Sequence, residues 1–320
     1  MRPKKRKAEM SKTKKQFVYS HERPSIAADI VAMGVRRLPA VNALRDGEMQ
    51  MMVLLVRRSQ AASAFPGSWA LPGGFFKPTD ASIEYCAARE LKEETNLDAK
   101  TLVPFGNFSS PKRDPRGWYT SVPYLAIISA NDLARVKIKA DTDVDRAEWF
   151  AVRYERKLSS MIVSLSSDSG VGFEFSADFK TNGLAQPKVR TEFRGDVLAF
   201  DHGEIIATAL LALGLPGKRL RSIAFLGEEF TIPELRNVYR FMLGVSDEIE
   251  AIASKPTKRS EEEQRVWDGL DADTKGRAKR IIPITFKRAA VHFLEETGGR
   301  ISGKRHRPAP VYRWKGYIPD

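Results

Sequence analysis

The sequence predicts an α/β protein of two domains with a basic arm before them. Its 320 residues exceed the roughly 100–200 of a single domain. Apolar runs of strand length alternate with helical patterns along most of the chain, and the C-terminal part combines helices with short strands. We place the boundaries at 1–20 for the arm, 21–213 for the α/β domain and 214–320 for the C-terminal domain.

The α/β domain is expected to contain buried strands and two main helices. One helix, from about Ile83 to Thr95, follows a loop rich in Gly and Pro, and Ser82 can cap it. The other is expected in LAFDHGEIIATALLALGL, with Asp201 as its cap. The strands and one hairpin are expected in MQMMVLLVRRS, VPYLAIISA, DTDVDRAEWFAV and MIVSLSSDSGVGFEFSADF.

The C-terminal domain has the element order of a winged helix-turn-helix. A helix begins at the capping box Thr231-x-x-Glu234, and a second helix, ITFKRAAVHFLEETGG, is expected to stop at Gly298. Two short strands around a basic turn are expected in GRISGKRHRPAPVYRWKG. The polar segment 245–276 between the helices is longer than an ordinary connection, so it either holds a helix near 261–270 or is mobile.

The charge predicts a polyanionic partner, most simply double-stranded DNA. The net charge is +13 and the pI is near 9.7, with +7 in residues 1–20 and +8 in residues 277–320. An acidic membrane surface is the weaker alternative, because no basic amphipathic helix and no membrane-length apolar run is visible. The single cysteine, Cys86, excludes an internal disulfide and predicts a cytoplasmic protein.

Two basic groups in the C-terminal domain are the candidates for DNA contact. One group lies off the apolar stripe of the second helix, where a recognition helix faces the groove. The other is the basic turn, which suits phosphate or minor-groove contact. The alternative is a solvated basic surface. The candidates are Thr285, Lys287, Arg288 and His292 on the helix and Lys304, Arg305 and Arg307 in the turn.

An acidic cluster interrupts this basic chain. Glu90, Glu93 and Glu94 lie within five residues, so a helix places Glu90 one turn from the other two. Carboxylates gathered in this way commonly hold a hard cation such as Mg²⁺. The alternative is a solvated acidic helix face.

The stretch from Leu71 to Leu97 resembles the Nudix box, G-x5-E-x7-REUxEExGU, in which U is aliphatic. RELKEET matches its core. The resemblance implies that Glu90, Glu93 and Glu94 are metal ligands or the base, with Glu93 and Glu94 catalytic if the chain is an enzyme, and that Arg89 orients the loop and helix. The resemblance also implies a Nudix α/β/α sandwich before the winged helix-turn-helix.

The loop departs from the Nudix pattern. The first glutamate position is Ala81, Asp80 lies one place earlier, the loop from Gly74 is one residue longer, and Asn96 replaces a glycine. Asn96 can still adopt a left-handed conformation. With the metal helix kept and the loop altered, we expect a regulator with weak or no hydrolase activity, and the alternative is an active diphosphatase.

Both halves together resemble the NrtR family of Nudix-related regulators of NAD metabolism. RDPRG at Arg113–Gly117, LAFDHGEII, EEFTIPELRNVYRFMLG and RHRPAPVYRW carry this resemblance, and the long segments near 155–195 and 245–280 indicate a diverged, NadQ-like branch. It implies a bacterial homodimeric repressor, associated with the nucleoid through operator DNA. It also implies an adenine nucleotide effector, ADP-ribose, ATP or NAD, in the Nudix pocket.

The effector site is expected to use cationic side chains and the loop before the metal helix. Guanidinium groups suit diphosphate oxygens. A surface turn stapled by Asp114 is the alternative for the RDPR segment. The candidate nucleotide-binding residues are Gly74, Arg89, Arg113, Asp114, Arg116 and Arg57, with Arg58 as a further candidate.

Other conspicuous residues are expected to be structural. His202 is expected to pack at a helix N-terminus, and Cys86 to be a small core residue. The rings of Trp69, Phe75 and Phe76 are expected to pack under the loop rather than stack on adenine. A third function, a Nudix enzyme acting on RNA, would also explain the charge, and the winged-helix pattern argues against it.

Overall fold

The computed structural model describes two β-sheets and the helices packed on them. It describes residues 20–37, 49–99, 101–129, 132–136, 144–179, 188–190, 198–214, 221–255, 257–281, 294–301 and 309–315. Residues 1–19 of the basic arm therefore lie outside the described residues. No helix in the described part of the chain is long and apolar enough to cross a membrane.

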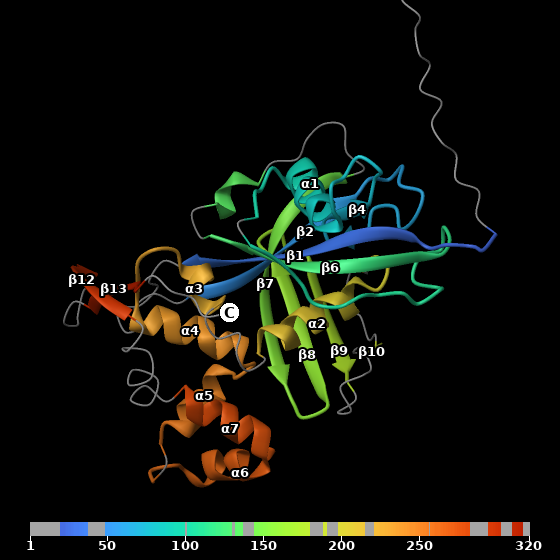
Figure 1. Ribbon diagram of the computed structural model, residues 1–320. Coiled ribbons are helices and arrows are strands. Elements are labelled where there is room, and N and C mark those ends of the chain that lie inside the picture. The colour runs from blue at the N-terminus through green and yellow to red at the C-terminus, as the bar shows by residue number, and fades with distance from the viewer. Residues whose placement is uncertain are drawn as a thin grey trace, which may run out of the picture.

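Among the described residues, ten strands form the larger sheet, which is mixed. Figure 1 shows this sheet at the centre of the molecule. Its main order is β10-β9-β8-β7-β2-β1-β6-β5, with β3 on β2 and β4 on β1. The central β1 pairs parallel with β6 and antiparallel with β2. The strands are β1 (Ser25–Arg37), β2 (Met49–Arg58), β3 (Trp69–Ala70), β4 (Gly73–Phe75), β5 (Leu102–Pro104), β6 (Tyr119–Ile128), β7 (Val144–Arg156), β8 (Ser160–Ser167), β9 (Gly172–Asp178) and β10 (Lys188–Arg190).

Each face of this sheet has its own apolar core. Ala28, Ile30 and Ala32 of β1 pack with Leu91 of α1 (Ile83–Thr95). The alternate residues Val31 and Met33 belong to the other core, which includes α2 (His202–Leu213). A strand buried on both faces reads as a continuous apolar run, which explains why nine consecutive residues, 27–35, are buried. A short 3-10 helix, η1 (Leu133–Arg135), follows β6.

Local capping fixes the two helices that matter for function. The Ser82 hydroxyl accepts a hydrogen bond from the Tyr85 amide, and α1 ends at Asn96 in the left-handed conformation with φ 62°. The capping box of Thr231 and Glu234 begins α4 (Ile232–Met242). All three features were predicted from the sequence and are confirmed.

The segment 155–195 extends the sheet by the hairpin β8–β9 and the short β10. The hairpin was predicted, and its apolar side chains Met161, Val163 and Leu165 join the core that α2 covers.

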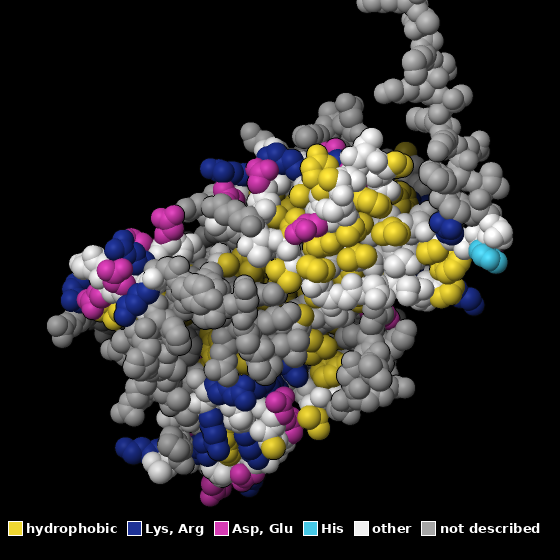
Figure 2. All heavy atoms as spheres, in the orientation of Figure 1, with side chains coloured by type: hydrophobic (Ala, Val, Ile, Leu, Met, Phe, Trp, Pro, Cys, Tyr) yellow, Lys and Arg dark blue, Asp and Glu magenta, His cyan; other side chains and the backbone are white. Residues whose placement is uncertain are grey.

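The C-terminal part contains five helices in the described ranges and a three-stranded sheet of order β11-β13-β12. The helix expected near 261–270 is present. Figure 2 shows charged side chains gathered over the helices α5–α7, at the lower end of the molecule. The remaining elements are α3 (Arg221–Leu226), β11 (Phe230–Thr231), α5 (Asp247–Ala253), α6 (Glu261–Gly269), α7 (Ala272–Arg280), β12 (Leu294–Ile301) and β13 (Ala309–Trp314).

The predicted helix ending at Gly298 is wrong over its last turn. Leu294–Ile301 form β12, paired antiparallel with β13, and Gly298 has φ 79° where the register shifts. Helix propensity is a weak local preference, and long-range backbone pairing overrides it here. The two strands around a basic turn are confirmed, whereas the turn itself lies outside the described residues.

Candidate functional site

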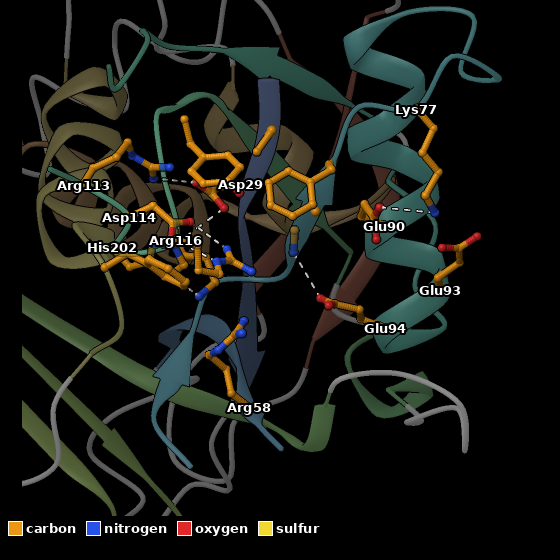
Figure 3. Close-up of a pocket in the computed structure, with 17 residues that line it drawn as sticks. Asp29, Arg58, Lys77, Glu90, Glu93, Glu94, Arg113, Asp114, Arg116 and His202 are labelled. Carbon is orange, nitrogen blue, oxygen red and sulfur yellow. Dashed lines mark hydrogen bonds and ion pairs between the residues drawn. The ribbon is translucent and has the colours of Figure 1, made fainter. Parts of the chain in front are cut away.

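A cavity of about 370 Å³ lies between α1 and the N-terminal end of α2 (Figure 3). Its volume is within the usual range for small-molecule sites. One wall carries carboxylates and the other carries guanidinium groups and aromatic rings. The cavity is lined by Ala27, Asp29, Arg58, Leu71, Gly73, Gly74, Phe75, Lys77, Glu90, Glu93, Glu94, Arg113, Asp114, Arg116, Tyr119, Phe200 and His202.

Arg89 organises the acidic wall. Its Nε and Nη2 each donate to one oxygen of Asp80 at 2.8 Å, and its Nη1 donates to Glu90 at 2.6 Å and to Glu93 at 3.1 Å. The hydrogen bonds from Arg89 lower the pKa of Asp80 to about 2. Asp80, one place before the expected glutamate, therefore ties the altered loop to the helix.

The loop at Gly73 and Gly74 lies against the carboxylates of α1. The Gly73 amide donates to Glu94 Oε2 at 3.1 Å, and burial raises the pKa of Glu94 to about 8. A Cβ on Gly74 would lie 2.5 Å from the carboxyl carbon of Glu90. Position 73 requires a glycine because a Cβ there would lie 2.4 Å from the Ala28 carbonyl oxygen of β1.

The acidic wall carries the carboxylates of Glu90, Glu93 and Glu94, the type of ligand that Mg²⁺ requires. Carboxylate oxygens are the ligands that Mg²⁺ prefers. However, the described residues contain no group of three acids, histidines or cysteines placed to hold a metal ion. Arg89 donates to both Glu90 and Glu93. Glu94 accepts from the Gly73 amide (Figure 3). These three carboxylates would hold the ion once their side chains turned toward it.

Arg113 forms a buried ion cluster at the other wall. Its side chain is 4% exposed and its Nη2 donates to Asp29 at 3.1 Å and to Asp201 at 2.6 Å. Ser121 Oγ donates to the same Asp29 oxygen at 2.6 Å. The predicted cap residue Asp201 makes no side-chain cap hydrogen bond because its carboxylate is bound to Arg113. The charge of Arg113 is therefore already balanced within the protein.

His202 completes this cluster as a structural residue. Its Nδ1 accepts a hydrogen bond from the Leu71 amide at 2.8 Å, and burial lowers its pKa. This agrees with the expected packing at the helix N-terminus. Cys86 is buried in the core under α1, as predicted.

Arg116 lies among three aromatic rings of the same wall. Asp114 holds its guanidinium through a fork, from Nε at 2.9 Å and Nη2 at 2.7 Å. The guanidinium carbon lies 5.2–5.5 Å from the ring centres of Phe75, Tyr119 and Phe200. The expected staple by Asp114 is present, and it lies in the cavity wall rather than in a simple surface turn.

Some residues that the sequence analysis treated alike have different surroundings in the structure. Arg58 lines the cavity, whereas Arg57 does not and instead donates from Nε to the Gly67 carbonyl. Trp69 is buried, as expected for packing, but Phe75 and Phe76 are each 38% exposed, so the expectation of packing under the loop is wrong for them.

None of the predicted DNA-contacting residues belongs to the described part of the chain. Thr285, Lys287, Arg288, His292, Lys304, Arg305 and Arg307 all lie outside the described residues.

Sequence reasoning missed several lining residues. Asp29 interrupts the apolar run of β1, and an acid inside a buried strand was the available signal. Phe200 has a left-handed backbone with φ 54°, which is uncommon for a bulky residue and could not be seen in the sequence. Lys77 and Tyr119 also line the cavity and carried no distinctive pattern.

Comparisons with known proteins agree with this geometry. Residues 36–158 match the family model described as NUDIX domain. The ADPR responsive transcriptional repressor NtrR of Acinetobacter baylyi is 27% identical over 197 residues, 61% of each chain. The chain spans about three fifths of the length of the curated relatives it matches.

Two solved structures share the fold over nearly the whole chain. A MutT/nudix family protein from Enterococcus faecalis is 27% identical, with a TM-score of 0.58 over 94% of this chain and 90% of the other. Shewanella oneidensis NrtR, crystallised with a 27mer DNA, is 22% identical, with a TM-score of 0.51 over 91% and 93%. The comparisons confirm the Nudix fold class and the likeness to NrtR-type regulators.

Proposed function

The chain carries a Nudix domain, and from this premise we propose that it is a DNA-binding transcriptional repressor controlled by an adenine nucleotide. The nucleotide binds in the cavity between α1 and α2, and the first candidate is ADP-ribose, before ATP and NAD. The genes of NAD synthesis are the proposed targets. The protein acts on chromosomal DNA in the bacterial cytoplasm.

The cavity supports a nucleotide ligand. It combines aromatic surface with the cationic side chains of Arg58, Lys77 and Arg116, a mixture that suits a base and a diphosphate. The remaining candidate residues have a supporting role in this proposal. They are Gly74 in the loop, Arg89 on the helix, and Arg113 and Asp114 in the wall. The A. baylyi relative is named as responsive to ADPR, which makes ADP-ribose the first ligand to test.

The C-terminal part supports DNA binding. Its three-stranded sheet with a capped helix beside it fits a winged helix, and residues 277–320 carry a net charge of +8. The helix residues Thr285, Lys287, Arg288 and His292 and the turn residues Lys304, Arg305 and Arg307 remain the proposed contacts. We also propose a homodimer, since such domains commonly bind two half-sites.

One observation carries the regulatory proposal. Strand β1 has Ala27 and Asp29 in the cavity wall and ends at Arg37, whose Nε donates to Glu234 of α4 at 2.8 Å. A single strand therefore connects the cavity wall to α4, the helix that begins at the capping box. A ligand acts through such a link only if it binds the two conformations unequally.

Fluorescence anisotropy with DNA from upstream of NAD-synthesis genes tests the proposal. The full chain should bind this DNA more tightly than scrambled DNA at the same salt concentration. One of ADP-ribose, ATP and NAD should change that affinity. Equal affinity for both DNAs, or no response to any of the three nucleotides, would overturn the regulator.

Hydrolysis of ADP-ribose is the second candidate. The observation that favours it is Glu94, whose pKa is raised to about 8, a range that suits acid–base chemistry. Glu93 and Glu94 remain the proposed catalytic residues if Mg²⁺ rearranges Glu90, Glu93 and Glu94. Release of AMP from ADP-ribose by wild type and not by Glu94→Gln would establish the enzyme, and no release from wild type would exclude it.

A further inference from the structure

Phe75 presents an apolar ring to the ligand cavity. It lies at the end of β4, lines the cavity and is 38% exposed. The exposed part of the Phe75 ring is therefore available for contact with a ligand. The adjoining Phe76 is exposed to the same 38% but does not line the cavity. Phe76 follows the end of β4, and its amide still pairs with the Ile26 carbonyl of β1. Successive residues of such extended backbone point to opposite faces, which separates the two rings.

The surroundings hold the Phe75 ring in place. Its centroid lies 5.1 Å from that of Tyr119, with the planes inclined by 32°, close to an offset stack. The guanidinium of Arg116 lies 5.2 Å from the Phe75 centroid and is itself fixed by the Asp114 fork. A ring that is ordered before the ligand arrives loses little conformational entropy on binding.

The same cavity offers the cationic side chains of Arg58 and Lys77 to the charged part of the ligand. Lys77 lies 3.9 Å from Glu90 at the acidic wall, and the glycine backbone at 73 and 74 allows close approach. Phe75 directly follows Gly74 in β4, so the ring and these cationic side chains line one connected cavity.

We propose that Phe75, backed by Tyr119 and Arg116, is the stacking platform for the nucleobase of the effector. Aromatic side chains bind bases through their π-faces, and removal of one such contact weakens binding by about 5- to 150-fold. This inference deepens the proposed function and rests on it, because it assigns one end of the proposed effector to named residues.

Affinity measurements on matched variants form the first test. Isothermal titration calorimetry of the full chain with ADP-ribose should show at least about five-fold weaker binding in Phe75→Leu. Phe76→Leu should bind as wild type does, since that ring lies outside the cavity wall. Phe75→Trp should restore the affinity, because an indole also stacks on a base.

A spectroscopic readout separates stacking from a general structural effect. Indole fluorescence should be quenched by ADP-ribose in Phe75→Trp beyond the wild-type change, and in Phe76→Trp by no more than in wild type. Unchanged ADP-ribose affinity in Phe75→Leu, or equal quenching in both tryptophan variants, would overturn the platform and leave the regulator standing. Failure of wild type to bind ADP-ribose, ATP and NAD would overturn both.

Discussion

Arg37, the last residue of β1, donates from Nε to Oε1 of Glu234 at 2.8 Å, and Glu234 also closes the capping box of α4 by accepting from the Thr231 amide at 2.7 Å. The same glutamate therefore caps the start of α4 and accepts a hydrogen bond from the last residue of β1, the strand that lines the ligand cavity. Its side chain is 9% exposed, while that of Arg37 is 45% exposed.

Loss of this contact should uncouple effector from DNA. In Arg37→Ala we expect ADP-ribose to bind with unchanged affinity but to change DNA affinity much less than in wild type, where couplings of about 5- to 150-fold are usual. Stability should fall by less than about 1 kcal/mol because the pair is partly solvated. DNA anisotropy with and without ADP-ribose measures the coupling.

Arg36→Ala is the matched control for that experiment. Arg36 also lies at the end of β1, but it pairs with Asp168 of the β8–β9 turn rather than with α4. It should retain the wild-type response. Equal loss of coupling in both variants would argue against the specific path through Glu234.

Removal of Arg113 should destabilise the α/β domain strongly. Arg113→Ala leaves Asp29 and Asp201 as buried carboxylates without their guanidinium, and breaking a buried pair in this way costs about 3–5 kcal/mol. Urea denaturation measures the free energy of unfolding. Arg57 is exposed, and its Nε donates to the Gly67 carbonyl, so Arg57→Ala should change this free energy by less than about 0.5 kcal/mol.

Glu94 should make stability depend on pH. Its pKa rises from 4.5 to about 8 on folding, so between these values the unfolded state loses a proton that the folded state keeps. This contribution therefore lowers stability as the pH rises through that window. At pH 8, Glu94→Gln should have a higher melting temperature than wild type, by roughly 2–4 °C for each kcal/mol of destabilisation that the substitution removes. At pH 4.5 the two proteins should have the same melting temperature. Parallel melting curves across the window would contradict the shift.

Arg277 should hold helix α7 against the end of α4 and the end of β7. Its guanidinium donates to the carbonyls of Leu243 at 2.5 Å, Gly244 at 3.1 Å and Arg156 at 2.9 Å. Each buried carbonyl left unpaired costs about 1–3 kcal/mol, so Arg277→Ala should lower the free energy of unfolding by at least about 3 kcal/mol. Lys279→Ala, exposed on the same helix, should have little effect, and similar losses in both would contradict this role.

The role of the segment 245–280 follows from that contact. The sequence left open whether it was helical or mobile, and its caps at Ser246, Ser260 and Asp271 are visible local signals for α5, α6 and α7. That Arg277 reaches the end of β7 at Arg156 could not be read locally, because the two residues are 121 positions apart.

The sequence by itself determined the elements whose signals are local. The capping residues Ser82 and Thr231 and the spacing of Glu90, Glu93 and Glu94 act within a turn or two of chain, so helix α1, helix α4 and the Nudix resemblance were all predictable.

Only the tertiary structure decided which of those residues share a site. It made Leu294–Ile301 a strand through pairing with β13, and it brought Asp29, Arg113 and Asp201 together from three distant segments. It also turned Phe75 into the cavity and Phe76 away from it. These outcomes depend on long-range pairing, burial and ion pairing, whose free energy arises only when distant parts of the chain meet.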